Sequence, residues 1–171
     1  MIDDLLDFAR SNGSLRVRPV SLAQTAAAVQ DDLDPAIAAA GAHIDVQDFI
    51  GEADPSQLHT LLQNLLQNSL NYRHPHRGVR ITIRAAGVAD SWYLEFADTG
   101  IGISPENRQR ALEPLVRLES KVAGTGLGLA TCNRIAQAHG GHLQLSETDG
   151  GGLTVRVWFG GGNTLDQSRL L

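Results

Sequence analysis

The chain has 171 residues, a length that suits one domain with its own hydrophobic core. A net charge of -5 and a pI near 5.6 argue against the basic surface of a nucleic-acid binder, and a single cysteine, Cys132, excludes an internal disulfide. There is no signal-peptide pattern and no apolar run of about 20 residues, so we expect a cytoplasmic protein whose present segment does not contact a membrane.

Hydrophobic spacing and turn residues predict short strands that alternate with helices. Apolar side chains at residues 2–10 form one helical stripe, which is too short to be stable alone and is expected to continue an upstream helix. The elements expected after it are a strand at 15–20, a helix from Ser21 to about Ala40, a strand at 42–46, a helix from Asp54 to about Tyr72, strands at 79–85 and 92–96, a short helix from Ser104, a helix at 127–139, and strands at 142–145 and 153–159. This order predicts an α+β fold, a two-layer sandwich of a mixed, mainly antiparallel sheet with helices on one face.

Three asparagines follow one edge of the leucine-rich helix that begins after Asp54. Asn64, Asn68 and Asn71 fall within roughly 60° of one another around the helix axis. Asparagine costs about 0.7 kcal/mol relative to alanine inside a helix, so three of them on one edge call for a reason. Their amide oxygens suit Mg²⁺ that arrives with phosphates, and the alternative is a solvated polar face.

A glycine-containing turn follows the strand that ends at Phe96. Asp98 stands at the strand end, where its carboxylate can accept a hydrogen bond from an exocyclic amine such as that of adenine. Gly100 and Gly102 let a planar ring come close to the backbone. The alternative is an ordinary tight turn with an exposed aspartate.

A second glycine segment opens the helix expected at 127–139. Gly124, Gly126 and Gly128 would leave backbone N–H groups open to an anion at the helix N-terminus. The GxGxG spacing lacks the Gly-Lys-Ser/Thr of a Walker loop and the preceding strand of a Rossmann motif. A structural hinge is the alternative for this segment alone.

Taken together, these segments resemble the catalytic and ATP-binding domain of sensor histidine kinases, most closely phytochrome-type and related light-sensing kinases. That domain shares the Bergerat ATP-binding fold with DNA gyrase, MutL-type repair proteins and a cytosolic chaperone family. Residues 64–72 resemble its N box, and 98–102 and 124–129 resemble its two glycine boxes. By this resemblance, 1–13 would be the end of a dimerisation helix and its linker, 14–160 the catalytic domain, and 161–171 a flexible tail.

The resemblance implies ATP or ADP and Mg²⁺ as cofactors. Asn68 would coordinate Mg²⁺ with Asn64 beside it as a polar partner to phosphate or water, and Asp98 would bind the adenine amine. The further cofactor-binding residues that it implies are Asn71, Tyr72, Gly100, Gly102, Ile103, Gly124, Thr125, Gly126, Leu127, Gly128 and Leu129. Arg117, like Tyr72, matches a position that approaches the phosphates. The expected catalytic residues are Asn64 and Arg117.

The resemblance also implies which reaction the site serves. Hydrolysing members of the superfamily carry a glutamate as general base where this chain has Asn64, so the site is expected to hold ATP for transfer. No phosphoacceptor histidine motif is present. The chain is therefore expected to be part of a protein histidine kinase that phosphorylates a histidine on an absent dimerisation domain. A response regulator would be its partner, the full-length protein would be a homodimer, and nucleic acid would not be bound.

Two alternatives stay open at this point. One is a degenerate nucleotide-binding or docking module without kinase activity, which the altered segment at 112–115 favours and the intact asparagine and glycine boxes oppose. The chain departs from the family pattern at two places. Leu112 and Leu115 stand where phenylalanines are usual, and Asn71 replaces a commonly basic residue. The other alternative is a serine kinase that acts on an anti-sigma-type partner, and the dimerisation-helix pattern at 2–10 counts against it.

Overall fold

The computed structural model describes residues 14–118 and 125–160. The helical stripe expected at 2–10, the tail expected at 161–171 and Gly124 lie outside the described residues.

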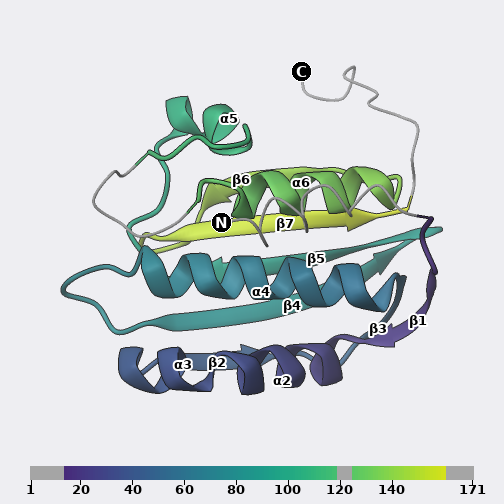
Figure 1. The fold of residues 1–171 in the computed structure, drawn as a ribbon, viewed down its shortest axis with the longest axis horizontal. Helices are drawn as coiled ribbons and strands as arrows, with labels where there is room; N and C mark the ends of the chain where they lie inside the picture. Colours follow the sequence, from purple (N-terminus) through teal and green to yellow (C-terminus); the bar gives the residue numbers. More distant parts are fainter. Residues whose placement is uncertain (1–13, 119–124, 161–171) are drawn as a thin grey trace.

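A five-stranded mixed sheet is the larger layer of the fold (Figure 1). In spatial order its strands are β2 (His43–Val46), β4 (Arg80–Val88), β5 (Ser91–Asp98), β7 (Leu153–Phe159) and β6 (Leu143–Glu147). β2 pairs with β4 in parallel, whereas the other three neighbouring pairs are antiparallel. Two short strands, β1 (Arg18–Ser21) and β3 (Ile50–Ala53), form a separate antiparallel ribbon.

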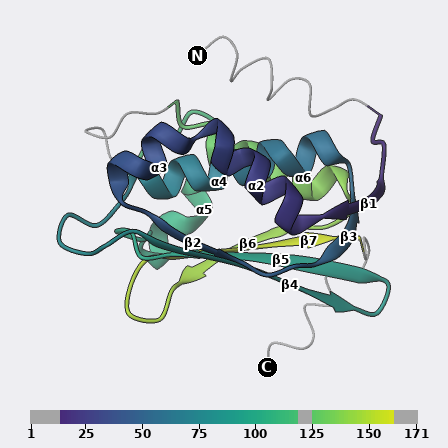
Figure 2. The ribbon, with the colours of Figure 1, turned by 90° about the horizontal axis from the view of Figure 1, so that it is seen from below.

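The longer helices gather on one face of this sheet, as Figure 2 shows from the side. They are α2 (Leu22–Asp32), α3 (Asp34–Ala40), α4 (Pro55–Asn71) and α6 (Gly128–Ala138). A 3-10 turn, η1 (Pro105–Asn107), and the short α5 (Arg108–Ala111) follow β5. The predicted two-layer α+β sandwich with a mixed, mainly antiparallel sheet is thus confirmed.

Two elements differ from the sequence-based expectation. The single helix predicted up to Ala40 is two helices, α2 and α3, which meet at Leu33. Pro35 lacks a backbone N–H and its ring would clash with the carbonyl four residues earlier, so a helix begins anew at this point. The strand β3 was not predicted at all.

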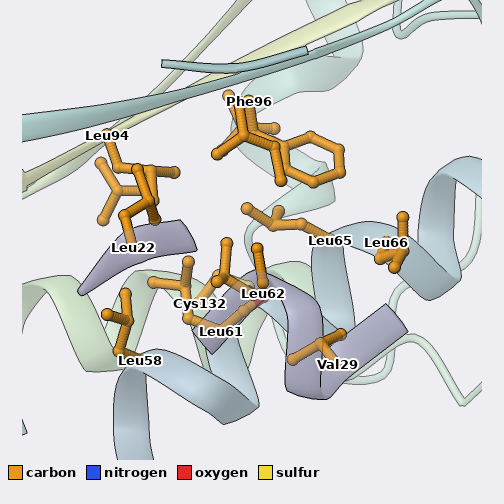
Figure 3. Packing of buried hydrophobic residues seen from close by; sticks show 14 of the residues in the cluster. Leu22, Val29, Leu58, Leu61, Leu62, Leu65, Leu66, Leu94, Phe96 and Cys132 are labelled. Atoms are coloured by element: carbon orange, nitrogen blue, oxygen red, sulfur yellow. The ribbon is translucent and has the colours of Figure 1, made fainter. Parts of the chain in front are cut away.

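The core lies between the helices and the sheet, and α4 contributes most to it (Figure 3). Asp54 caps α4 by accepting backbone hydrogen bonds from Ser56 at 3.0 Å and Gln57 at 3.2 Å. The buried leucines of α4 recur at helical spacing and are at most 3% exposed: Leu58, Leu61, Leu62, Leu65, Leu66 and Leu70. The polar edge of the same helix is left at the border of the core. Among the described residues, no helix is both long and apolar enough to cross a membrane.

Candidate functional site

A cavity of about 570 Å³ opens beside the C-terminal half of α4, between that helix, the N-terminus of α6 and the segment that follows β5. Its volume lies within the range of small-molecule binding pockets. Its wall consists of Asn64, Gln67, Asn68, Asn71, Tyr72, Asp98, Ile101, Gly102, Ile103, Ser104, Asn107, Ala111, Val116, Leu118, Thr125, Gly126, Gly128, Leu129 and Leu153. The three sequence segments singled out above therefore meet around one cavity.

Asp98 provides a buried carboxylate in the cavity wall, at the end of β5. Its side chain is held by three donors within the protein and only 7% of the residue is exposed. Oδ1 accepts the backbone N–H groups of Gly100 at 2.9 Å and Leu153 at 3.0 Å, and Oδ2 accepts the Ser69 hydroxyl at 2.6 Å. A carboxylate oxygen can accept two hydrogen bonds, so Oδ2 retains capacity for a donor on a ligand.

The backbone behind Asp98 is closely packed against the turn between β6 and β7. Gly152 in that turn has φ +121°, and a Cβ there would lie 2.0 Å from the Asp98 carbonyl oxygen, so only glycine fits. On the other side, the Ile101 N–H donates to the carbonyl of Tyr72 at 3.0 Å, which ties the turn to the end of α4. The position of Asp98 is thus fixed from two directions.

The asparagine edge of α4 forms the opposite part of the wall. Asn64, Asn68 and Asn71 all line the cavity and are partly exposed. The amide nitrogen of Asn64 donates to the Thr60 carbonyl at 2.9 Å, and Gln67 donates to the amide oxygen of Asn71 at 3.0 Å. Since these amides are oriented by neighbours on the same helix, the edge presents ordered polar groups to a ligand.

The second glycine segment faces this edge. Thr125, Gly126, Gly128 and Leu129 line the cavity, and α6 begins at Gly128 without a side-chain cap. A Cβ at Gly128 would be 3.2 Å from both amide atoms of Asn68, so the backbone of the first turn approaches that side chain closely. Backbone N–H groups without a cap at a helix N-terminus suit an anion.

Three of the predicted site residues do not line the cavity. Gly100 is buried next to Asp98, and Leu127 is buried, with 2% of the residue exposed. Arg117 is exposed, whereas its neighbours Val116 and Leu118 line the cavity. Gly124 lies outside the described residues, so the structure gives it no place.

The segment that departs from the family pattern is split between core and solvent. Leu112 packs against the hydrophobic core. Leu115 is 64% exposed and has φ +64°, a backbone conformation that is uncommon for a leucine. Its N–H donates to the Gly126 carbonyl at 3.0 Å, which links this segment to the second glycine segment.

Arg73, at the end of α4, donates to the Leu70 carbonyl at 3.2 Å and thus contacts the last turn of that helix.

Sequence reasoning missed eight residues of the wall. Gln67 could have been found, because it lies three and four residues from the asparagines at 64 and 71 and so shares their helix edge. Ser104 and Asn107 directly follow the first glycine turn, which was a weaker signal. No signal in the sequence pointed to Leu153, because its position in the cavity wall depends on the pairing of β7 with β5. Ile101, Ala111, Val116 and Leu118 complete the set.

The family model for histidine kinase-, DNA gyrase B- and HSP90-like ATPases matches residues 53–161, a segment that contains the whole cavity wall. The chain is 30% identical over 172 residues to the circadian input-output histidine kinase CikA of Synechococcus elongatus, with 93% of this chain and 22% of CikA covered. It is 36% identical over 149 residues to the sensor protein IrlS of Burkholderia pseudomallei, with 82% of this chain and 32% of IrlS covered. The chain thus spans about a fifth to a third of the length of these relatives.

A solved structure shows the same architecture. The crystal structure of full-length ShkA in complex with AMPPNP superposes with a TM-score of 0.71 at 27% identity. The match covers 92% of this chain and 34% of ShkA.

Proposed function

The chain belongs to the family of histidine kinase-, DNA gyrase B- and HSP90-like ATPases, as a catalytic domain of the sensor histidine kinase type, and from this premise we propose that its cavity binds ATP together with Mg²⁺. The observation that carries the proposal is the Asp98 carboxylate, which three internal donors hold in the cavity wall. An acceptor oriented in this way suits the exocyclic amine of adenine. The complex of ShkA with AMPPNP supports the same ligand class.

The phosphates would lie at the other end of the cavity, between Asn68 and the first turn of α6. The uncapped N–H groups there favour an anion, and the amide oxygen of Asn68 is a ligand of the hard type that Mg²⁺ accepts. When bound, Mg²⁺ would neutralise charge on the phosphates. Asn64, Asn71, Tyr72 and Thr125 would contribute further polar groups.

Asn64 supports transfer rather than hydrolysis. Its amide nitrogen is engaged by the Thr60 carbonyl at 2.9 Å, and an amide has no useful basicity at neutral pH. Water near the γ-phosphate would therefore meet no general base at this position. The domain would hold ATP until a better nucleophile arrives.

For the whole protein we propose an ATP-dependent histidine kinase. The chain at 14–160 would donate the γ-phosphoryl group to a histidine on a dimerisation domain, to which 1–13 would lead. The full-length protein would be a homodimer in the cytoplasm, where a response regulator would receive the phosphoryl group. The sensor-kinase relatives CikA and IrlS support this assignment.

A second candidate is a degenerate module that binds nucleotide without transfer. It is favoured by the exposed Leu115 and by Arg117, which does not line the cavity although it was expected to approach the phosphates. The two candidates share the nucleotide site and differ only in transfer.

Calorimetry tests the nucleotide site. We expect ADP to bind the unmutated chain with a dissociation constant between about 1 µM and 1 mM and to bind more tightly when Mg²⁺ is present. Asn68→Ala should reduce the Mg²⁺-dependent gain by about tenfold or more, because it removes the metal-facing oxygen. Gln63→Ala, on the same helix but outside the cavity wall, is the matched control. No binding by the folded, unmutated chain would refute the proposal.

Transfer is tested with a longer chain that includes the upstream helices and with γ-labelled ATP. Acid-labile label on a histidine is expected for a kinase, and Asn68→Ala should abolish it. Good nucleotide binding without labelled histidine would favour the degenerate module.

A further inference from the structure

Arg77 lies in the loop between α4 and β4 and joins two turns that are distant in sequence. Its Nη2 donates to the Gly100 carbonyl at 3.0 Å, and its Nη1 donates to the Gly150 carbonyl. Gly100 belongs to the turn after β5, and Gly150 to the turn between β6 and β7. Because a guanidinium presents its donors in a rigid planar fork, one side chain fixes the spacing of both turns.

The turn between β6 and β7 needs such a restraint. Gly150, Gly151 and Gly152 all have positive φ, at +84°, +98° and +121°, and three glycines in series lose much conformational entropy when they are ordered. A Cβ at Gly151 would be 2.5 Å from Nη1 of Arg77. The glycine there thus permits the close approach of the guanidinium that holds the turn.

Once it is ordered, the turn between β6 and β7 orients the carboxylate of Asp98. Leu153 follows the three glycines directly, and its N–H donates to Oδ1 of Asp98 at 3.0 Å. Gly100, whose carbonyl accepts from Arg77, donates its own N–H to the same oxygen at 2.9 Å. Both backbone donors to Asp98 therefore belong to segments that Arg77 holds.

Arg77 itself does not line the cavity, and its Nε is buried without a hydrogen-bond partner among the described residues. Its side chain is half-buried outside the cavity wall, and its hydrogen bonds are made to the two carbonyls. We propose that Arg77 is a positioning residue for nucleotide recognition. It orders the turn at Gly150–Gly152, and this order lets Asp98 present Oδ2 to the base. This inference rests on the proposed nucleotide site and adds a determinant of base selectivity to it.

The test compares Arg77→Ala and Arg77→Lys with Arg80→Ala. Arg80 is an exposed arginine three residues later, and its backbone N–H, which donates to Thr99 at 3.0 Å, survives the substitution. Binding of Mg-ADP and Mg-IDP is measured by calorimetry, because inosine carries an oxygen where adenine carries the exocyclic amine. If the ordered turn falls to about one tenth of molecules in Arg77→Ala, the dissociation constant for ADP rises about tenfold.

The selectivity readout separates positioning from a general loss of structure. In Arg77→Ala the preference for ADP over IDP should fall by a similar factor, whereas the factor by which Mg²⁺ strengthens ADP binding should stay unchanged. Arg77→Lys keeps the charge on a single donor nitrogen without the planar fork, so its affinity for ADP and its base preference should lie between those of Arg77→Ala and Arg80→Ala. If Arg77→Ala does not fold, the comparison of Arg77→Lys with Arg80→Ala decides alone. Affinity and base preference equal to those of Arg80→Ala would overturn the proposal.

Amide hydrogen exchange without nucleotide distinguishes this proposal from the binding function itself. The Leu153 N–H should exchange at least about tenfold faster in Arg77→Ala, or in Arg77→Lys if Arg77→Ala does not fold, than in Arg80→Ala. Unchanged exchange would refute the ordering role. If the unmutated chain binds no nucleotide, the proposed function and the recognition role of Arg77 both fail, whereas normal binding with unchanged selectivity in the Arg77 variants overturns only the latter.

Discussion

Asp98→Asn probes the base end of the cavity with the smallest possible change of shape. Oδ1 of Asp98 accepts two backbone N–H groups, from Gly100 and Leu153, so the amide oxygen of an asparagine would take that place. The amide NH₂ would then occupy the position of Oδ2, where the carboxylate now accepts the Ser69 hydroxyl and would accept the adenine amine. The amide NH₂, a hydrogen-bond donor, would then face the adenine amine, which is also a donor.

The magnitude follows from the two parts of this change. A hydrogen bond to a charged acceptor contributes about 1.5 to 3 kcal/mol, and leaving buried donors unpaired costs about 1 to 3 kcal/mol. Together these ranges give about 2.5 to 6 kcal/mol, and a loss in the lower half of that range, about 3 to 4 kcal/mol, corresponds to a dissociation constant for ADP that is roughly 100-fold to 1000-fold higher. Because an amide NH₂ can donate to the oxygen of inosine, the affinity for IDP should fall much less.

Calorimetry with Mg-ADP and Mg-IDP is the assay, and thermal unfolding followed by circular dichroism checks that the variant is folded. Glu95→Gln is the matched control, since it makes the same acid-to-amide change on β5 at a residue that pairs with Arg156 outside the cavity wall. If Asp98→Asn binds ADP within about threefold of the unmutated chain, the base does not pair with this carboxylate. That result would refute the orientation of the ligand.

Three further predictions concern the core and the cavity. Cys132 is fully buried, and burial raises the pKa of its thiol far above the usual range. A thiol reagent such as DTNB should therefore label Cys132 only at the rate of unfolding, and rapid labelling of the native chain would contradict this. Burial raises the pKa of Asp54, but backbone N–H donors from Arg16 and from the first turn of α4 outweigh that effect and hold the pKa below its usual value. Asp54→Ala should therefore cost about 1 to 2 kcal/mol in urea unfolding at pH 7, and the cost should shrink as the pH falls below about 4, where a constant cost would count against the charged cap. Asn64→Glu should raise ATP hydrolysis, by up to about 100-fold in a phosphate-release assay, and unchanged hydrolysis with intact Mg-ATP binding would show that a missing base does not limit the rate.

Local signals were enough to predict α4 from the sequence. Its leucines follow one arc, and Asp54 and Pro55 mark its beginning, because a cap and a helical period depend only on residues close in the chain. The paired strands β4 and β5 were predicted for the same reason, since their apolar residues alternate. The break at Leu33 was also visible in principle, as Pro35 stands in the middle of the expected helix.

The strand β3 was not predictable, because its pattern is opposite to the usual one. Its large apolar residue, Ile50, is 61% exposed, whereas Gly51 and Ala53 face inward. The reason is the ring of Trp92 on β5, since a Cβ at Gly51 would lie 2.5 Å from it. A large side chain supplied by a distant strand fills the space that β3 would otherwise have to fill.

The cavity wall also has a part that could be predicted from the sequence and a part that could not. Residue types and spacing in the sequence identified the asparagine edge and both glycine segments, but they did not tell which side of the 112–118 segment faces inward. Val116 and Leu118 line the cavity and Arg117 does not, and the Leu115 N–H donates to the Gly126 carbonyl, a contact that no local pattern in the sequence reveals. The role expected for Arg117 stays a prediction.

Gly128 connects the two parts of the site that the sequence suggested separately. A glycine at a helix start gives an anion access to the backbone N–H groups, yet the α-carbon of Gly128 also lies against the amides of Asn68 and Asn64, where a Cβ would be 3.2 Å and 3.4 Å away. A side chain at 128 would therefore press on the proposed metal ligand before it met any phosphate. The first turn of α6 and the asparagine edge of α4 are therefore packed together, so a displacement of Gly128 would also displace Asn68, the proposed Mg²⁺ ligand.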